Sequence, residues 1–224
     1  ISFFKKNGFS IAVGIIGFVF LFKVGEAFLG RMSIVFYKEI GFSKSEIAIF
    51  SKAFGWVTTI VFTLLGGLLA MRSGSIKTMF IAGILMAVTN LLFSFLNWYV
   101  QTIPIVFFEF NLNFILWTWN LETSNHQLVF GAAVILDDIA AAFATVAFVA
   151  FISLLVDRSY TATQYALLAS IGTAGRTTLA SSSGALVDWL NGDWGTFFIL
   201  TAVMVIPSLI LLWLMKDKIR LSEK

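Results

Sequence analysis

Six apolar runs, each about as long as a lipid bilayer is thick, constrain this chain more than any other feature of its sequence. A helix needs about 20 predominantly apolar residues to cross the hydrocarbon core. The runs lie at about residues 11–36, 46–71, 78–99, 128–156, 163–187 and 195–215. Only 12% of the 224 residues are charged, whereas a soluble domain has about 25%. The sequence therefore predicts an all-α membrane protein with six transmembrane helices.

The aromatic-rich stretch 100–126 departs from this helical pattern. Apolar residues stand at every second position from Phe108 to Leu116, and polar residues such as Glu109 separate them. A period of two is typical of an extended segment and argues against a seventh spanning helix. We expect a loop that lies at the outer membrane surface and contains His126. A strand-like hairpin and a re-entrant segment are the alternatives.

The distribution of Lys and Arg predicts the orientation in the membrane, because basic residues are enriched in cytoplasmic loops. With six crossings, only Lys38 and Lys44 lie on the side opposite the two termini. The side of the termini carries nine basic residues: Lys5, Lys6, Arg72, Lys77, Arg158, Lys216, Lys218, Arg220 and Lys224. Both termini are therefore predicted to be cytoplasmic, in a multi-pass membrane protein.

Arg31 lies near the outer end of the first apolar run and is expected at the membrane interface. Six further ionisable residues are the candidates for a functional role: Lys23, Glu26, Lys52, Asp137, Asp138 and Arg176. A charged side chain at the centre of a membrane helix costs roughly 2.5–3.5 kcal/mol on insertion scales, and such residues usually mark substrate or ion pathways. We therefore predict that these side chains bind a solute or protons. Purely structural pairing stays open as an alternative.

That structural alternative can be made specific. Lys23 and Glu26 are three residues apart and can neutralise one another on one helix face, and an Asp can pair with Arg176. Lys52 can extend toward the interface instead of facing a cavity. Asp137 and Asp138 are about 100° apart around a helix, so at most one of them is expected to face a cavity well.

The charged runs are the first two of each group of three, which is the pattern expected if they line a polar cavity. Pairs of three-helix inverted repeats of this kind build each half of major facilitator transporters. This predicts a first repeat in residues 1–99, the outer loop in 100–127, and a second repeat with a cytoplasmic tail in 128–224. The chain would then be one six-helix half of such a transporter.

Two long stretches, 36–74 and 134–172, resemble the C-terminal half of AmpG-type muropeptide permeases of the major facilitator superfamily. "KVGEAF" in the first apolar run is similar to a charged motif of that family, and "YTATQYALL" is the most specific part. The resemblance covers about residues 10–98 and 128–215. Met71 departs from the pattern, because an acidic residue is usual at that position.

The resemblance implies proton-driven import of anhydro-muropeptides from the periplasm for cell-wall recycling. It places Lys23, Glu26 and Asp137 on the family's charged helix positions. The implied partners are a muropeptide-like solute, protons, the lipid bilayer and an N-terminal six-helix half. Glu26 or an Asp would carry the proton, since burial disfavours the charged form of a carboxyl group. No cofactor and no nucleic-acid partner are expected.

Three other functions compete with this hypothesis. A related carrier for another solute, such as acetyl-CoA, shares much of the same pattern. The chain can also be a non-transporting remnant of an interrupted transporter gene. An intramembrane enzyme with Asp137 and Asp138 as a catalytic pair is disfavoured, because adjacent helical residues point apart. The absence of Cys and the single His exclude Cys and His metal clusters.

Overall fold

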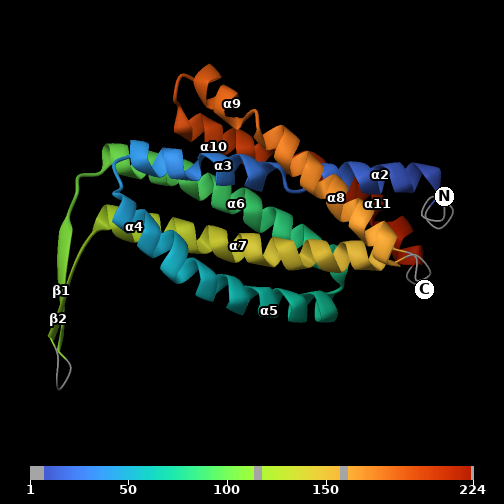
Figure 1. Ribbon diagram of the computed structural model, residues 1–224, viewed down its shortest axis with the longest axis horizontal. Helices are drawn as coiled ribbons and strands as arrows, with labels where there is room; N and C mark the ends of the chain where they lie inside the picture. The colour runs from blue at the N-terminus through green and yellow to red at the C-terminus, as the bar shows by residue number, and fades with distance from the viewer. Residues whose placement is uncertain (1–7, 114–117, 157–160, 223–224) are drawn as a thin grey trace.

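Long helices make up almost all of the structure and lie roughly side by side along one axis (Figure 1). The computed structural model describes residues 8–113, 118–156 and 161–222. In chain order the elements are α2 (Phe9–Leu21), α3 (Val24–Glu39), α4 (Lys44–Ala48), the π-helical segment η1 (Ile49–Phe54), α5 (Gly55–Ser73), α6 (Ser75–Thr102), β1 (Phe107–Asn113), β2 (Thr118–Ser124), α7 (Asn125–Leu155), α8 (Thr161–Ala180), α9 (Ser183–Trp189), α10 (Trp194–Val203) and α11 (Ile206–Ser222).

In the described part of the chain, five helical spans are long and apolar enough to cross a membrane. They are Phe9–Glu39, Lys44–Ser73, Ser75–Thr102, Asn125–Leu155 and Trp194–Ile219. Each coincides with a predicted apolar run. The remaining run, 163–187, is also helical, as α8 and α9, but these helices are not among the five spans. The structure thus agrees with a multi-pass membrane protein, and the sixth crossing stays a prediction.

The first and last spans are each interrupted, between α2 and α3 and between α10 and α11. Pro207 explains the second break, because proline lacks an N–H and its ring clashes with the preceding helical turn. The two broken spans touch at Gly25 of α3. A Cβ there would lie 2.6 Å from the backbone carbonyl oxygen of Thr201. Only a glycine at this position lets the two helices approach so closely.

Two clusters of buried apolar side chains hold the helices together, one toward each end of the bundle. The cluster nearer the chain termini includes Phe18, whose ring meets Phe151 edge-on with centroids 5.1 Å apart. The other includes Phe36, whose ring meets Phe198 edge-on at 4.7 Å. The charged side chains of the spans lie between and beside these two clusters.

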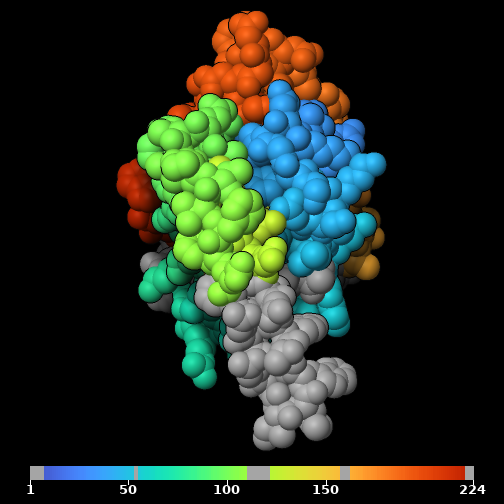
Figure 2. All heavy atoms as spheres, turned by 90° about the vertical axis from the view of Figure 1, so that its left-hand side faces the viewer, coloured from blue at the N-terminus to red at the C-terminus, as the bar shows by residue number. Residues whose placement is uncertain are grey.

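Residues of the stretch 100–126 form an antiparallel hairpin of β1 and β2, in which Phe107 pairs with Ser124 and Asn113 with Thr118. The extended backbone agrees with the period of two, but the hairpin was only an alternative to the expected loop. Figure 1 shows it projecting across the helix axis at one end of the bundle. Figure 2 looks onto this end, where the ends of α3 and α6 lie side by side.

His126 was predicted to lie in a surface loop, and this prediction is wrong. It belongs to the first turn of α7, is only 7% exposed, and its Nε2 lies 2.9 Å from the carbonyl oxygen of Ile103. The polar residues next to it cap the first turn of α7 and form hydrogen bonds with backbone groups at the foot of the hairpin. Asn125, for example, accepts a hydrogen bond from the backbone N–H of Val106. His126 therefore anchors the hairpin to the end of α6.

Candidate functional site

The first group of intramembrane charges is an ion pair at the break between α2 and α3. Lys23 Nζ lies 3.4 Å from Glu26 Oε2, and the two side chains are only 12% and 14% exposed. Lys23 Nζ also donates a hydrogen bond of 2.8 Å to Thr145 Oγ1 on α7. The Lys23–Glu26 pair is the one salt bridge in the described ranges 8–113, 118–156 and 161–222. The pair therefore connects the first span to α7.

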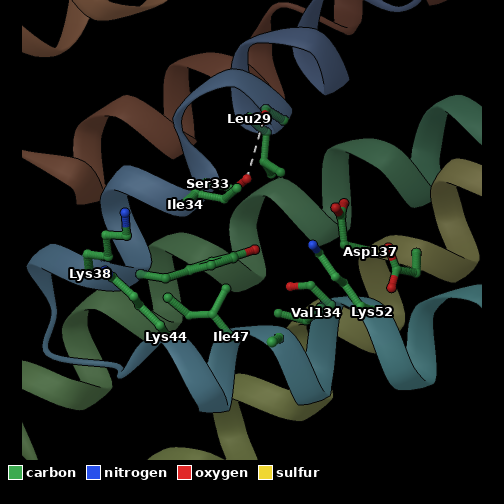
Figure 3. A pocket seen from close by; sticks show the side chains of 14 residues that line it. Leu29, Ser33, Ile34, Lys38, Lys44, Ile47, Lys52, Val134 and Asp137 are labelled. Atoms are coloured by element: carbon green, nitrogen blue, oxygen red, sulfur yellow. Dashed lines mark hydrogen bonds between the residues drawn. The ribbon is translucent and has the colours of Figure 1, made fainter.

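The second group lines a pocket of about 400 Å³ between α3, the continuous rod of α4 and η1, and α7 (Figure 3). Its polar lining residues are Ser33, Tyr37, Lys38, Lys44, Ser51, Lys52, Asp137 and Asp138. Apolar side chains such as Leu29, Ile47 and Val134 form the rest of the wall. The pocket thus presents charges of both signs, and the described residues give these charges no salt bridge to one another.

The rod of α4 and η1 supplies one wall because its sequence follows helical spacing. Positions 44, 47, 48, 51 and 52 all line the pocket, and residues three and four apart share one face of a helix. The π-helical turn η1 carries Lys52, and such turns often occur at functional sites. Figure 3 shows the Lys52 and Asp137 side chains converging across the pocket. Of the two alternatives for Lys52, the structure adopts the cavity-facing one.

Both aspartates of α7 line the pocket, which corrects the expectation that at most one faces a cavity. Asp138 packs against Gly55, where a Cβ would lie 2.7 Å from Asp138 Oδ2. This buried oxygen accepts no hydrogen bond from the part of the chain that the structure describes. Asp137 lies near enough to Glu26 for the two carboxyl groups to interact electrostatically. Asp137 and Asp138 therefore both belong to the wall that α7 supplies.

The predicted site residues therefore divide into three sets. Lys52, Asp137 and Asp138 line the pocket, whereas Lys23 and Glu26 form the ion pair outside its lining. Arg176 lies on α8 with its side chain exposed and is not part of the lining. No salt bridge from Arg176 to either aspartate occurs within the described residues, so the structural pairing proposed for them is not present.

Sequence reasoning missed several lining residues on α3 and α4. Lys38 and Lys44 were expected only as charges of an outer loop, and the sequence pattern did not single out Ser33, Tyr37 or Ser51, yet all five line the pocket. The helical stripe at 44, 47, 48, 51 and 52 was a signal that could have identified the α4 and η1 wall. The α3 wall has no comparable signal, because its contribution depends on where α3 packs against α7.

Known proteins similar to this chain are named as transporters or permeases and not as enzymes. Transporter AmpG 4 of Rickettsia conorii is 32% identical over 97% of this chain and 46% of its own length. The anhydromuropeptide permease of Escherichia coli is 29% identical over 94% of the chain and 37% of its own length. Transporter AmpG 1 of Rickettsia prowazekii is 26% identical over 97% and 44%.

The chain spans less than half the length of these relatives, from 37% to 46%. No family model matches the chain. The relatives nevertheless align with 94% to 97% of this chain. The homologues of this membrane protein are therefore AmpG-type permeases.

Proposed function

We propose that this chain is the C-terminal half of a secondary transporter that imports anhydro-muropeptides, driven by protons, across a bacterial inner membrane. The name of the Escherichia coli relative supports this solute over acetyl-CoA. The alignment with less than half of each relative supports a second, N-terminal half. In this proposal the chain contains two inverted three-helix repeats, with α8 and α9 forming the sixth crossing.

The pocket of mixed charge is the observation that carries the proposal. Its volume of about 400 Å³ lies within the range of small-molecule sites, roughly 300–1,000 Å³. Three lysines and two aspartates line it without salt bridges between them. Because unpaired charges in a membrane span are costly, Lys52, Asp137 and Asp138 are best explained as partners for the charges and amides of a solute. Muropeptides carry carboxylates and amides of this kind.

Glu26 and Asp137 are the proposed proton carriers. Burial disfavours the charged form of a carboxyl group, and Glu26 is only 14% exposed. Lys23 also binds Thr145 on α7, so a proton on Glu26 would weaken the ion pair that orients Lys23 beside the pocket-bearing helix. Transport would follow by rocking the two halves around the site, as in other carriers with repeated halves.

Uptake by vesicles that contain the full-length protein tests this function. We expect saturable, proton-dependent uptake of labelled anhydro-muropeptide. Asp137→Asn and Lys52→Gln should each reduce it strongly, because each removes a charge that lines the pocket. Asp217→Asn is the matched control, since Asp217 is exposed near the end of α11. Unchanged uptake with Asp137→Asn would contradict the pocket assignment.

The proposed orientation places the hairpin end outside and both termini in the cytoplasm. The chain contains no Cys, so single Cys variants give clean labelling. Ile105, beside the hairpin, is 56% exposed, and Lys218 is exposed near the end of α11. In intact cells an impermeant thiol reagent should label Ile105→Cys, whereas Lys218→Cys should react only after permeabilisation. The opposite pattern would overturn the orientation.

A further inference from the structure

The helices that form two walls of the pocket begin with the same capping arrangement. At the start of α4, Ser43 Oγ accepts a hydrogen bond from the backbone N–H of Glu46, and Glu46 Oε2 accepts one of 2.7 Å from the N–H of Ser43. At the start of α7, Ser124 Oγ accepts from the N–H of Gln127, and Gln127 Oε1 accepts one of 2.9 Å from the N–H of Ser124. Both are capping boxes, in which a Glu or Gln at the third helical position reaches back to the cap residue.

A direct hydrogen bond joins the two capping boxes. Gln127 Nε2 donates to Glu46 Oε1. The second carboxylate oxygen of Glu46 and the amide oxygen of Gln127 each accept a hydrogen bond from the backbone N–H of their own cap residue. Thr123 Oγ1, at the foot of the hairpin, also donates to Gln127 Oε1 at 3.1 Å. The caps thus orient both side chains before they meet, which lowers the entropic cost of the bond. An ionised acceptor makes such a bond stronger than one between neutral groups.

Two further contacts lie along α7, one made by the rod and one made by Gly55, the first residue of α5. A Cβ at Gly131 would lie 2.4 Å from Phe50 Cε1, so the Phe50 ring of η1 lies directly against the α7 backbone. Deeper in the bundle, Gly55 packs against Asp138. The Glu46–Gln127 hydrogen bond is the outermost of the three contacts. It is also the one made by side chains that belong neither to the pocket lining nor to an apolar cluster.

We propose that the Glu46–Gln127 hydrogen bond sets the separation of these two walls, so that both residues are positioning residues for Lys52 and Asp137. Glu46 lies between the lining residues Lys44 and Ile47 on α4, and α7 carries its lining residues Val134 and Asp137 below Gln127. A change in wall separation at this level alters how a solute fits between both walls. The inference rests on the proposed function, because it takes the pocket as the solute site.

Exchanging the two side chains separates this role from simple helix capping. Glu and Gln serve equally at the third position of a capping box, so all exchanges keep both caps. Gln127→Glu places two carboxylates face to face and removes the only donor between them. The double variant Glu46→Gln with Gln127→Glu restores one donor and one carboxylate acceptor, with their positions reversed. Gln101→Glu makes the same chemical change at the same end of the bundle and is the matched control.

Uptake kinetics of the full-length protein in vesicles test the proposal. Gln127→Glu should raise KM for anhydro-muropeptide by roughly tenfold, because solute binding would then have to offset the free energy that a hydrogen bond to a charged group supplies to the wall separation. It should change the maximal rate less. The double variant should return KM to near the wild-type value, and Gln101→Glu should leave it unchanged. An unaffected KM in Gln127→Glu, or a double variant as impaired as the single one, would overturn the proposal.

A second readout does not depend on transport. A Cys introduced at Ser51 in the pocket should react faster with an impermeant thiol reagent when Gln127→Glu is added, and at the original rate in the double variant. One outcome is that the wild-type protein takes up no muropeptide, while the reactivity of Ser51→Cys still rises with Gln127→Glu and returns in the double variant. In that case the proposed function fails and the positioning role stands. If reactivity does not follow the exchange, the positioning role is refuted whatever the solute.

Discussion

Replacing Glu26 by Gln in the full-length protein is expected to abolish accumulation of anhydro-muropeptide against its gradient. Glu26 Oε2 lies 3.4 Å from Lys23 Nζ in a setting that is largely shielded from water. Gln resembles the protonated acid in shape and hydrogen bonding but cannot release a proton. The variant should therefore still exchange internal for external solute, because exchange needs no net proton movement. Vesicle uptake with and without a pH gradient measures both activities.

Glu39→Gln is the control for this prediction, because it changes an exposed carboxylate at the end of the same helix, α3. It should leave accumulation unchanged. Membrane insertion of Glu26→Gln, followed by protein yield in the membrane fraction, should also match the wild type. Full accumulation by Glu26→Gln would refute Glu26 as a proton carrier and leave the Lys23–Glu26 pair as a structural contact.

Replacing Gly25 by Leu is expected to prevent the first and last spans from packing together. Even the first carbon of the new side chain would lie 2.6 Å from the Thr201 carbonyl oxygen and 2.9 Å from Val205 Cγ2. Because the nearer atom belongs to the backbone, a side-chain rotation cannot relieve the clash. Overpacking typically costs about 1–3 kcal/mol and sometimes more, and here we expect the upper end. Thermal unfolding in detergent should show a lower midpoint.

Gly30→Leu is the matched control, because Gly30 lies on the same helix and a Cβ there would have no neighbour within 4 Å among the described residues. Its unfolding midpoint should stay close to that of the wild type. A Gly25→Leu protein as stable as the wild type would show that α3 and α10 separate without cost. In that case the close approach at Gly25 would not be what holds the two broken spans together.

The ion pair and the pocket differ in how far each was predictable. Lys23 is the N-cap residue of α3 and Glu26 lies in the first turn of that helix, so their contact follows from local geometry, and the structure contains it. The pocket combines α3, the α4 and η1 rod, and α7, which are far apart in sequence. Pairing of Arg176 with an aspartate also depends on the distance between two helices, and the structure does not contain it.

The sequence by itself determined the long helices and the extended stretch between them. Hydrophobic length dictates which segments can cross a bilayer, and side-chain period distinguishes strand from helix. The period indicated an extended backbone, and residues 107–113 and 118–124 are strands. Only the tertiary structure decided that Lys38 and Lys44 share a pocket with Asp137, and that Gln127 binds Glu46. Such contacts depend on the rotation and relative height of packed helices. These are set by side-chain packing across interfaces, such as Phe50 against Gly131, and not by the local pattern of either helix.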